Sequence, residues 1–161
     1  MSNCNLIDSL RKSKIFRGFT DEELKMVSIS GSLETFDGNR IFLNEGDTPN
    51  TLYVIIRGHV EVFLPKKIAH TNRERATRVK LCEMTQGDCL GEYSLIDNNP
   101  ASASAITLEP SDLFKISKRS FDEIINSNDR SAKKIYHNIL LVLIKRARDY
   151  DKELDMCYYV Y

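Results

Sequence analysis

Between residues 32 and 117 the chain is divided into short apolar segments by turn-forming residues. Asp37-Gly38-Asn39 and Glu45-Gly46-Asp47 mark turns, and Arg57-Gly58 predicts a hairpin between the two segments beside it. The segments are residues 33–36, 40–43, 52–56, 59–64, 78–84, 103–108 and 113–116. Short strands at this spacing, rich in β-branched and aromatic residues, predict an all-β sandwich or barrel-like core.

Helical patterns flank this β region on both sides. Leu6, Ile7 and Leu10 recur at helical spacing, which predicts a helix over residues 3–14. Thr20 with Glu23 three positions later forms a capping box, so a second helix begins here. This second helix ends at Gly31. We therefore expect a single α+β domain over residues 1–161, with N-terminal helices over 1–31, strands over 32–117 and C-terminal helices over 118–161.

The C-terminal part predicts two helices. Ser117 or Ser120 caps the first, and the polar residues 126–129 separate it from a much longer one. The long helix carries a heptad seam in which apolar residues alternate by four and three positions, namely Tyr136, Leu140, Leu143, Ala147, Tyr150, Leu154 and Cys157.

A second apolar stripe, formed by Ile135, Ile139 and Val142, lies beside this seam. Two stripes on one helix need two partners. We expect the second stripe to face the β core and the seam from Tyr136 to Leu154 to pair with another copy in a homodimer. The alternative is that both stripes serve one irregular core.

Composition narrows the class of function. Lysine plus arginine balance aspartate plus glutamate, 23 against 23, which argues against a protein that coats nucleic acid. The longest apolar run, residues 139–144, is too short to span a bilayer. There is no signal-peptide pattern, so we expect reduced thiols and a cytoplasmic protein that does not bind membranes. The cysteines are scattered, at Cys4, Cys82, Cys89 and Cys157.

Residues 87–105, GDCLGEYSLIDNNPASASA, combine a glycine turn, one short apolar turn and a run of small side chains. Glu92 is the lone carboxylate within the small-residue part of this segment. General acid–base catalysis needs a partner group, and residues 87–105 contain no histidine, while the nearest carboxylates, Asp88 and Asp97, lie four and five positions from Glu92. The three histidines are isolated from the cysteines, so no metal site is expected. We predict no catalytic residues and no enzymatic activity.

Three segments occur in an order that carries a family resemblance: FDGNRIFLNEGD, LYVIIRGHVEVF and GDCLGEYSLIDNNPASASA, followed by a strand and a long terminal helix. In this the chain resembles cyclic-nucleotide-binding domains of the cAMP receptor protein type, from about Ile15 to the middle of the last helix. The resemblance implies a jelly-roll-like β-roll (a double-stranded β-helix) flanked by helices, with residues 87–105 as the phosphate-binding cassette.

The resemblance also implies the site. In this family the cyclic phosphate is held by backbone amides at the start of a short helix, where N–H groups are unsatisfied and the helix dipole is positive. Gly91 would let the backbone approach closely, and Glu92 would accept hydrogen bonds from the ribose 2′-hydroxyl. The amides of Tyr93, Ser94 and Leu95 would face the phosphate.

One position departs from the family pattern. In nucleotide-binding members an arginine follows the cassette proline, whereas here Ala101 follows Pro100. A hydrogen bond to a charged group contributes about 1.5–3 kcal/mol, which is about ten- to a hundredfold in affinity. Ser102 and Ser104 supply hydroxyls nearby, but these are neutral donors. An alternative role for Glu92 is structural, as a carboxylate that accepts from backbone amides.

Three outcomes remain open for the cassette. It binds cAMP or cGMP weakly, with Ser102, Ser104 and the helix amides sharing the phosphate. A cation from elsewhere replaces the missing arginine, for which Arg78, Lys80 and Arg40 are candidates. Or the cassette has lost nucleotide binding.

The function implied is that of a stand-alone sensor without an obligatory cofactor. A ligand in the cassette would change how the helices pack, and an unknown effector protein would detect that change. The alternative is a protein–protein dimerisation module with an empty cassette. Transcription factors of this superfamily continue into a winged helix-turn-helix, whereas this sequence stops at Tyr161. The sequence is therefore either a stand-alone sensor module or a fragment of a longer protein, and we expect no DNA binding by this chain.

Overall fold

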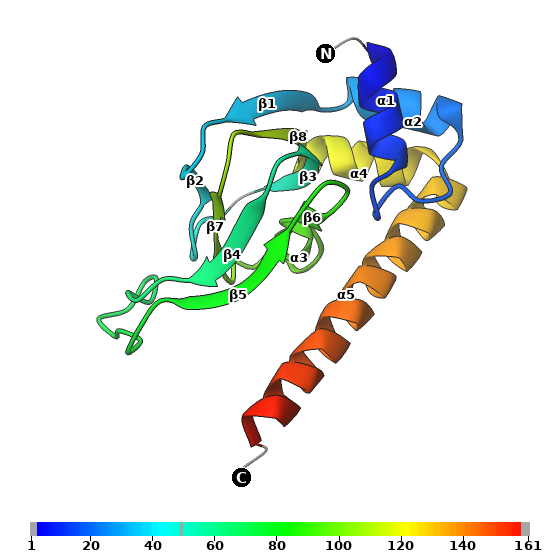
Figure 1. The fold of residues 1–161 in the computed structure, drawn as a ribbon. Coiled ribbons are helices and arrows are strands. Elements are labelled where there is room, and N and C mark those ends of the chain that lie inside the picture. Colours follow the sequence, from blue (N-terminus) through cyan, green and yellow to red (C-terminus); the bar gives the residue numbers. More distant parts are fainter. Residues whose placement is uncertain (1–2, 49, 159–161) are drawn as a thin grey trace.

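The computed structural model describes residues 3–48 and 50–158. Within these residues, eight strands form two antiparallel four-stranded sheets, and four of the five helices lie at one end and along one side (Figure 1). The first sheet has the order β1-β8-β3-β6, comprising β1 (Ser32–Phe36), β8 (Ser111–Ser117), β3 (Thr51–Arg57) and β6 (Cys89–Leu90). The second has the order β2-β7-β4-β5, comprising β2 (Ile41–Leu43), β7 (Ser104–Thr107), β4 (Val60–Leu64) and β5 (Val79–Met84). The predicted β-roll with flanking helices is confirmed.

Two details of the strand prediction are wrong. The two-residue strand β6 is missing from it, because two residues are too few to show alternation. The hairpin predicted at Gly58 is a corner between sheets: β3 pairs with β8 and β6, whereas β4 pairs with β5 and β7. Gly58 has φ +108°, and a Cβ there would lie 2.1 Å from the hydroxyl oxygen of Ser111, so the corner requires glycine.

The helix caps follow the prediction. In α2 (Asp21–Ile29) the Thr20 hydroxyl accepts from the Glu23 amide at 3.2 Å, and the Glu23 carboxylate accepts from the Thr20 amide at 2.7 Å. Ser117 caps α4 (Lys118–Ser127) by accepting from the Ser120 amide at 3.1 Å. Of the remaining helices, α1 spans Asn3–Arg11 and α5 spans Asp129–Tyr158, and α5 begins where the polar break was predicted.

The apolar core has two parts, which share β3. Leu52, Val54 and Ile56 face a cluster that includes residues of α1, α2, α4 and α5, while Tyr53 and Ile55 face a cluster inside the roll. Because successive side chains of a strand point to opposite faces, a strand buried on both faces is a continuous apolar run, and β3 has this pattern.

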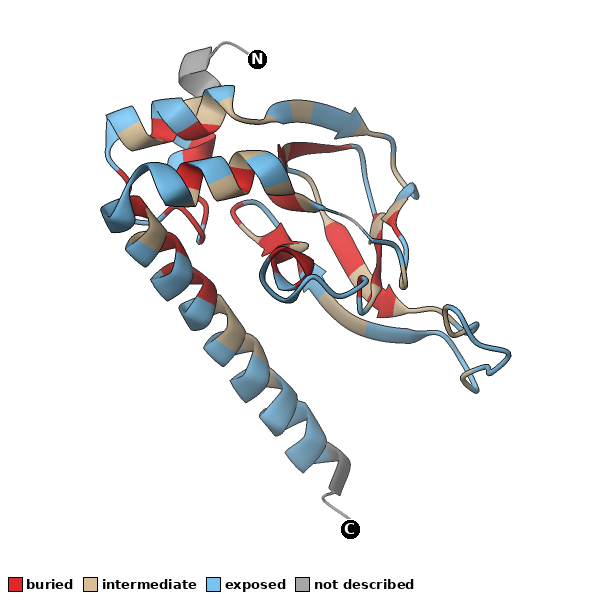
Figure 2. Ribbon diagram, turned by 180° about the vertical axis from the view of Figure 1, so that it is seen from behind, coloured by how far each residue is buried: buried red, intermediate tan, exposed pale blue. Residues whose placement is uncertain are grey.

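The two stripes of α5 have different surroundings. Ile135 and Ile139 are buried in the first core cluster, together with part of the protein's N-terminal region. The predicted seam faces outward at its clearest positions, with Tyr136 42% exposed, Leu140 56% and Leu154 57%. The alternative in which both stripes enter one core is therefore wrong. Burial on α5 is confined to its first half (Figure 2).

Two seam residues also contact their own chain. Leu143 packs partly against the first core cluster, and Tyr150 lines the cavity described below. Cys82 is a half-buried free thiol and Cys89 a buried one, while the side chains of Cys4 and Cys157 lie outside the described part of the chain. Within the described residues, no helix is long and apolar enough to cross a membrane.

Candidate functional site

Gly91 positions the cassette. The chain leaves β6, turns at Gly91 with φ +90° and enters the short helix α3 (Glu92–Asp97). A Cβ at residue 91 would lie 2.3 Å from the carbonyl oxygen of Thr51 in β3, so no other residue fits this approach. The predicted short helix after Gly91 is therefore present.

A cavity of about 100 Å³ lies beside this helix. Its wall inside the roll is apolar, and α5 closes another side with Arg146 and Tyr150. The predicted site residues that line it are Gly91, Glu92, Tyr93, Ser94, Ala101 and Ser102. The cassette also contributes Leu90, Ala103 and Ala105, which were not predicted as site residues.

Leu95 and Ser104 are predicted site residues that do not line the cavity. Leu95 is 3% exposed and belongs to the first core cluster, and its carbonyl accepts from the Lys118 ammonium at 2.9 Å. The Ser104 hydroxyl oxygen accepts from the Glu45 amide at 2.8 Å, which fixes the turn after β2. The Leu95 side chain thus packs in the core, and the Ser104 hydroxyl supports neighbouring backbone.

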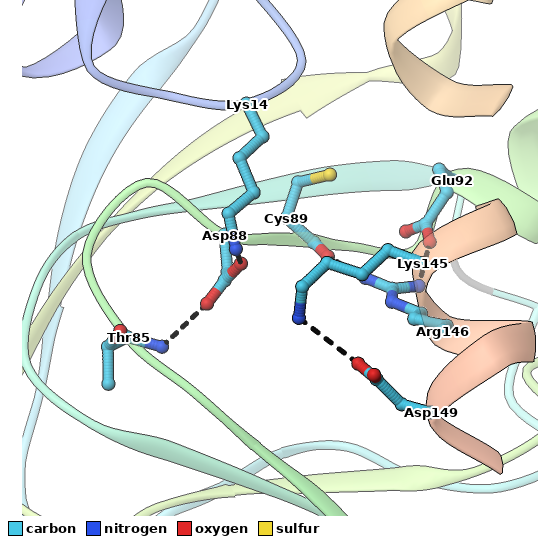
Figure 3. A network of polar contacts seen from close by, with 8 residues as sticks. All are labelled: Lys14, Thr85, Asp88, Cys89, Glu92, Lys145, Arg146 and Asp149. Atoms are coloured by element: carbon cyan, nitrogen blue, oxygen red, sulfur yellow. Dashed lines mark hydrogen bonds and ion pairs between the residues drawn. The ribbon is translucent and has the colours of Figure 1, made fainter. Parts of the chain in front are cut away.

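Glu92 is the most deeply buried charged group of the cavity, with 2% of its side chain exposed. One carboxylate oxygen, Oε1, is ion-paired with Arg146 of α5 (Figure 3). The structural alternative, a carboxylate that accepts from backbone amides, is wrong because Oε1 accepts from the Arg146 guanidinium and not from an amide. The other oxygen, Oε2, is buried and has no hydrogen-bond partner among the described residues.

Arg146 connects α5 to the cassette through more than this pair. Its guanidinium also donates to the carbonyl oxygen of Cys89 at 2.7 Å and lies 5.9 Å from the centre of the Tyr93 ring. Burial by itself would lower the pKa of Arg146, but the charge of Glu92 together with the smaller contributions of Tyr93 and Cys89 outweighs burial and raises this pKa above its usual value. Arg146 is therefore charged at any physiological pH.

The cations proposed from sequence lie elsewhere. Arg78 is ion-paired with Glu61 and stacks 3.8 Å from the centre of the Phe63 ring, and Lys80 is ion-paired with Glu83. Arg40 is exposed, and none of the three lines the cavity. Sequence reasoning missed Arg146, although one signal was available.

That signal is the position of Arg146 on α5. It follows Val142 by four residues and Ile139 by seven, so it continues the stripe that faces the chain's own core. A basic residue in line with a core-facing stripe indicates a buried acidic partner. The partner itself could not be identified from sequence, because Glu92 lies 54 residues away.

Ala101 lies on the cavity wall and is held by backbone hydrogen bonds. Its amide donates to the Asp47 carbonyl at 2.7 Å, and its carbonyl accepts from the Gly46 amide at 2.8 Å. The turn at Glu45-Gly46-Asp47 thus clamps the cassette. A longer side chain at residue 101 would therefore project from the cavity wall.

The family model described as the cyclic nucleotide-binding domain matches residues 33–128. The chain belongs to this family. A curated relative, the cyclic AMP receptor protein of Thermus thermophilus, is 26% identical over 147 residues, which are 91% of this chain and 63% of the relative. The chain thus spans less than two thirds of that relative's length.

Solved structures agree on the fold. A cyclic nucleotide-binding domain from Methylobacillus flagellatus superposes with a TM-score of 0.78 at 24% identity, covering 94% of this chain and 82% of that one. The regulatory domain of Toxoplasma gondii PKA, crystallised with cAMP, gives a TM-score of 0.64 at 23% identity, covering 80% and 46%. The cyclic nucleotide-binding fold therefore extends over most of the chain.

Proposed function

We propose that this protein is a regulatory module that binds a cyclic nucleotide, cAMP or cGMP, beside the cassette and transmits its occupancy through α5. Family membership supports the ligand class, and so do a relative named for cyclic AMP and a similar fold crystallised with cAMP. The observation that carries the proposal is the unpartnered oxygen of Glu92 at the cavity wall.

A buried acceptor without a donor costs about 1–3 kcal/mol, and more when it is charged. Buried polar groups in proteins therefore almost always have partners. A ligand hydroxyl would supply the missing donor, and a ribose 2′-hydroxyl has the required chemistry. One oxygen of the Glu92 carboxylate is thus paired with Arg146, and the other is available to accept a hydrogen bond from a ligand.

The phosphate would lie at the start of α3, close to the amides of Tyr93, Ser94 and Leu95 and to the hydroxyl of Ser102. Because Ala101 replaces the family arginine, we expect weaker binding than in family members that carry it. No second carboxylate or histidine lies among the described residues of the cavity, which supports a non-catalytic role.

A calorimetric titration with cAMP and with cGMP tests this function directly. Binding should also raise the melting temperature, since a ligand that binds the folded state alone stabilises it by about 2.7 kcal/mol at a hundred times its Kd. The absence of heat and of any melting shift at millimolar concentrations of both nucleotides would refute the proposal.

A second candidate function is a protein–protein module whose cavity stays empty. The observation in its favour is that the protein's own Arg146 already occupies one oxygen of Glu92. This module would rely on α5, whose seam residues Tyr136, Leu140, Ala147 and Leu154 are exposed. In both candidates we propose a cytoplasmic homodimer through this seam, with Leu143 and Tyr150 at its inner edge, an effector protein as reader and no DNA binding by this chain.

A further inference from the structure

The cavity holds one acid and one base. Among its described lining residues Glu92 is the acidic group and Arg146 the basic group, and the others are neutral. An anionic ligand that enters an apolar cavity needs a cation, because burying an unpaired charge is costly. Arg146 is the cation available to it.

The guanidinium has the donors for this task. Arginine carries five N–H groups in a fixed fork, and the bonds to Glu92 and Cys89 use two of them. Arg146 can therefore keep its bond to Glu92 while other N–H groups donate to an anion. The fork geometry matches a phosphate group particularly well.

The shape of the site brings a nucleotide-sized ligand against α5. The cavity of about 100 Å³ is smaller than the roughly 300–1,000 Å³ of most ligand pockets. A groove of about 670 Å³ between β5 and α5 shares four lining residues with the cavity, Leu81 and Cys82 of β5 and Arg146 and Tyr150 of α5. A ligand seated on Glu92 would therefore extend past the side chains of Arg146 and Tyr150.

The lysines of the groove have acidic neighbours. Lys80 is ion-paired with Glu83, and Lys152 lies 3.9 Å from Asp149. These pairs are exposed to solvent, where ion pairs are weak and screened. Arg146, with 19% of its side chain exposed, is the cation that is both shielded and shared by the two hollows.

We propose that Arg146 takes over the anion-binding role that Ala101 cannot perform, so that a bound cyclic nucleotide ties α5 to the cassette. This inference rests on the proposed function and adds the group that recognises the phosphate. It also explains how occupancy reaches α5: the ligand's anion is bound by the helix itself. Ligand binding then strengthens the docking of the second half of α5.

The first experiment compares Arg146→Gln with Arg148→Gln by calorimetry with cAMP, and by competition with adenosine, which has no phosphate. Arg148 is exposed on the same helix and makes no ion pair with any described residue, so it is the matched control. We expect Arg146→Gln to weaken cAMP about ten- to a hundredfold and to leave adenosine unchanged. Arg148→Gln should bind both as the wild type does.

Other outcomes separate the inference from the function. If Arg146→Gln binds cAMP as tightly as the wild type, or loses cAMP and adenosine equally, the assignment of Arg146 is wrong and the proposed function stands. If the wild type binds neither cAMP nor cGMP, the proposed function fails and the inference fails with it.

Arg146→Gln leaves Glu92 buried without its cation, which can destabilise the fold. Circular dichroism checks this, and Arg146→Lys retains the charge without the fork, so it should weaken cAMP less than Arg146→Gln. The double variant Ala101→Arg/Arg146→Gln places a cation elsewhere on the cavity wall, and it should regain the affinity for cAMP.

Hydrogen exchange of the double variant also tests whether Arg146 couples the bound ligand to α5. In the wild type, cAMP should slow exchange of the amides over residues 144–150, whereas in the double variant it should bind without this protection. Equal protection in both proteins would overturn the claim that Arg146 couples the ligand to α5.

Discussion

Two carboxylates, the half-buried Glu23 and the buried Glu92, hold α5 to the rest of the molecule, and they have hydrogen-bond partners to different degrees. Near the start of the helix, Glu23 of α2 accepts from the Lys134 ammonium at 2.6 Å, the Ser131 hydroxyl at 2.9 Å and the Thr20 amide at 2.7 Å. Further along, Glu92 of α3 is paired with Arg146 through one oxygen, and its other oxygen is left without a described partner.

The two halves of α5 also differ in how much apolar surface they bury. The first half of α5 buries Ile135 and Ile139, and Asn138 donates to the carbonyls of Ile15 and Arg17, each at 2.9 Å. In the second half the described residues of α5 are mostly exposed, and Arg146 is the main contact. A carboxylate whose oxygens both have hydrogen-bond partners holds its helix in place, whereas a carboxylate with one unpartnered oxygen can still accept a hydrogen bond from a ligand. We therefore expect the first half of α5 to be structural and the second half to respond to ligands.

The largest expected effect concerns the outward seam, where Leu140→Asp should convert a dimer to monomers. Leu140 is 56% exposed, so the change leaves the core of the monomer intact, but each dimer would bury two carboxylates without partners. Light scattering coupled to size exclusion measures the mass. Leu141→Asp, at an exposed position off the seam, is the control; if the Leu140 variant remains dimeric, the seam does not form the interface.

Ile139→Ala probes the structural half of α5. Ile139 is 2% exposed in the first core cluster, so its truncation should lower the free energy of unfolding by about 2–5 kcal/mol. Ile144→Ala, where the side chain is 48% exposed, should change it by less than about 0.5 kcal/mol. Urea denaturation at one protein concentration compares the two. Similar losses would show that the two halves are equally anchored.

Ala101→Arg should make nucleotide binding less dependent on α5. An arginine at this position would meet the phosphate from the cavity wall and raise the affinity for cAMP about ten- to a hundredfold. Calorimetry measures the Kd. Unchanged affinity would mean that the cation is not what limits binding. Asn99→Arg, exposed on the same segment and not among the residues that line the cavity, is the positional control.

The smallest effect is on acid stability, and it comes from Glu23. Burial raises the pKa of Glu23, but the hydrogen bonds from Lys134, the Thr20 amide and Ser131 outweigh this and lower the pKa from 4.5 to about 2. A lowered pKa means that the stabilisation is present above pH 4.5 and is lost as the pH falls toward 2.

Unfolding free energies of the wild type and Glu23→Gln between pH 2 and 6 measure this contribution. The difference between the two proteins should shrink as the pH falls. A difference that stays constant over this range would exclude the ionised Glu23 as its source.

Much of the fold could be predicted because its signals are local. Thr20 and Glu23 lie three positions apart and cap α2 by contacts within one turn, and Gly91 is required by its own φ angle. The strand alternation is equally local. The cassette could be assigned because the family motif places its residues on one continuous segment.

Other features depend on residues far apart. The two-residue strand β6 exists because Tyr53 and Val54 of β3 pair with it, and Gly58 turns a corner because β8 occupies the edge of β3 that a hairpin would need. The sequence of residues 52–64 does not distinguish a hairpin from a corner between two sheets, because a glycine turn is compatible with both.

The sequence by itself determined the family, the order of the elements, the caps and the absence of an arginine after Pro100. The tertiary structure alone decided that Arg146 meets Glu92, that one carboxylate oxygen is left over, and that Leu95 and Ser104 turn away from the cavity. The physical reason is that short-range preferences act along the chain, whereas the pairing of a buried charge depends on which helix the folded core brings beside it.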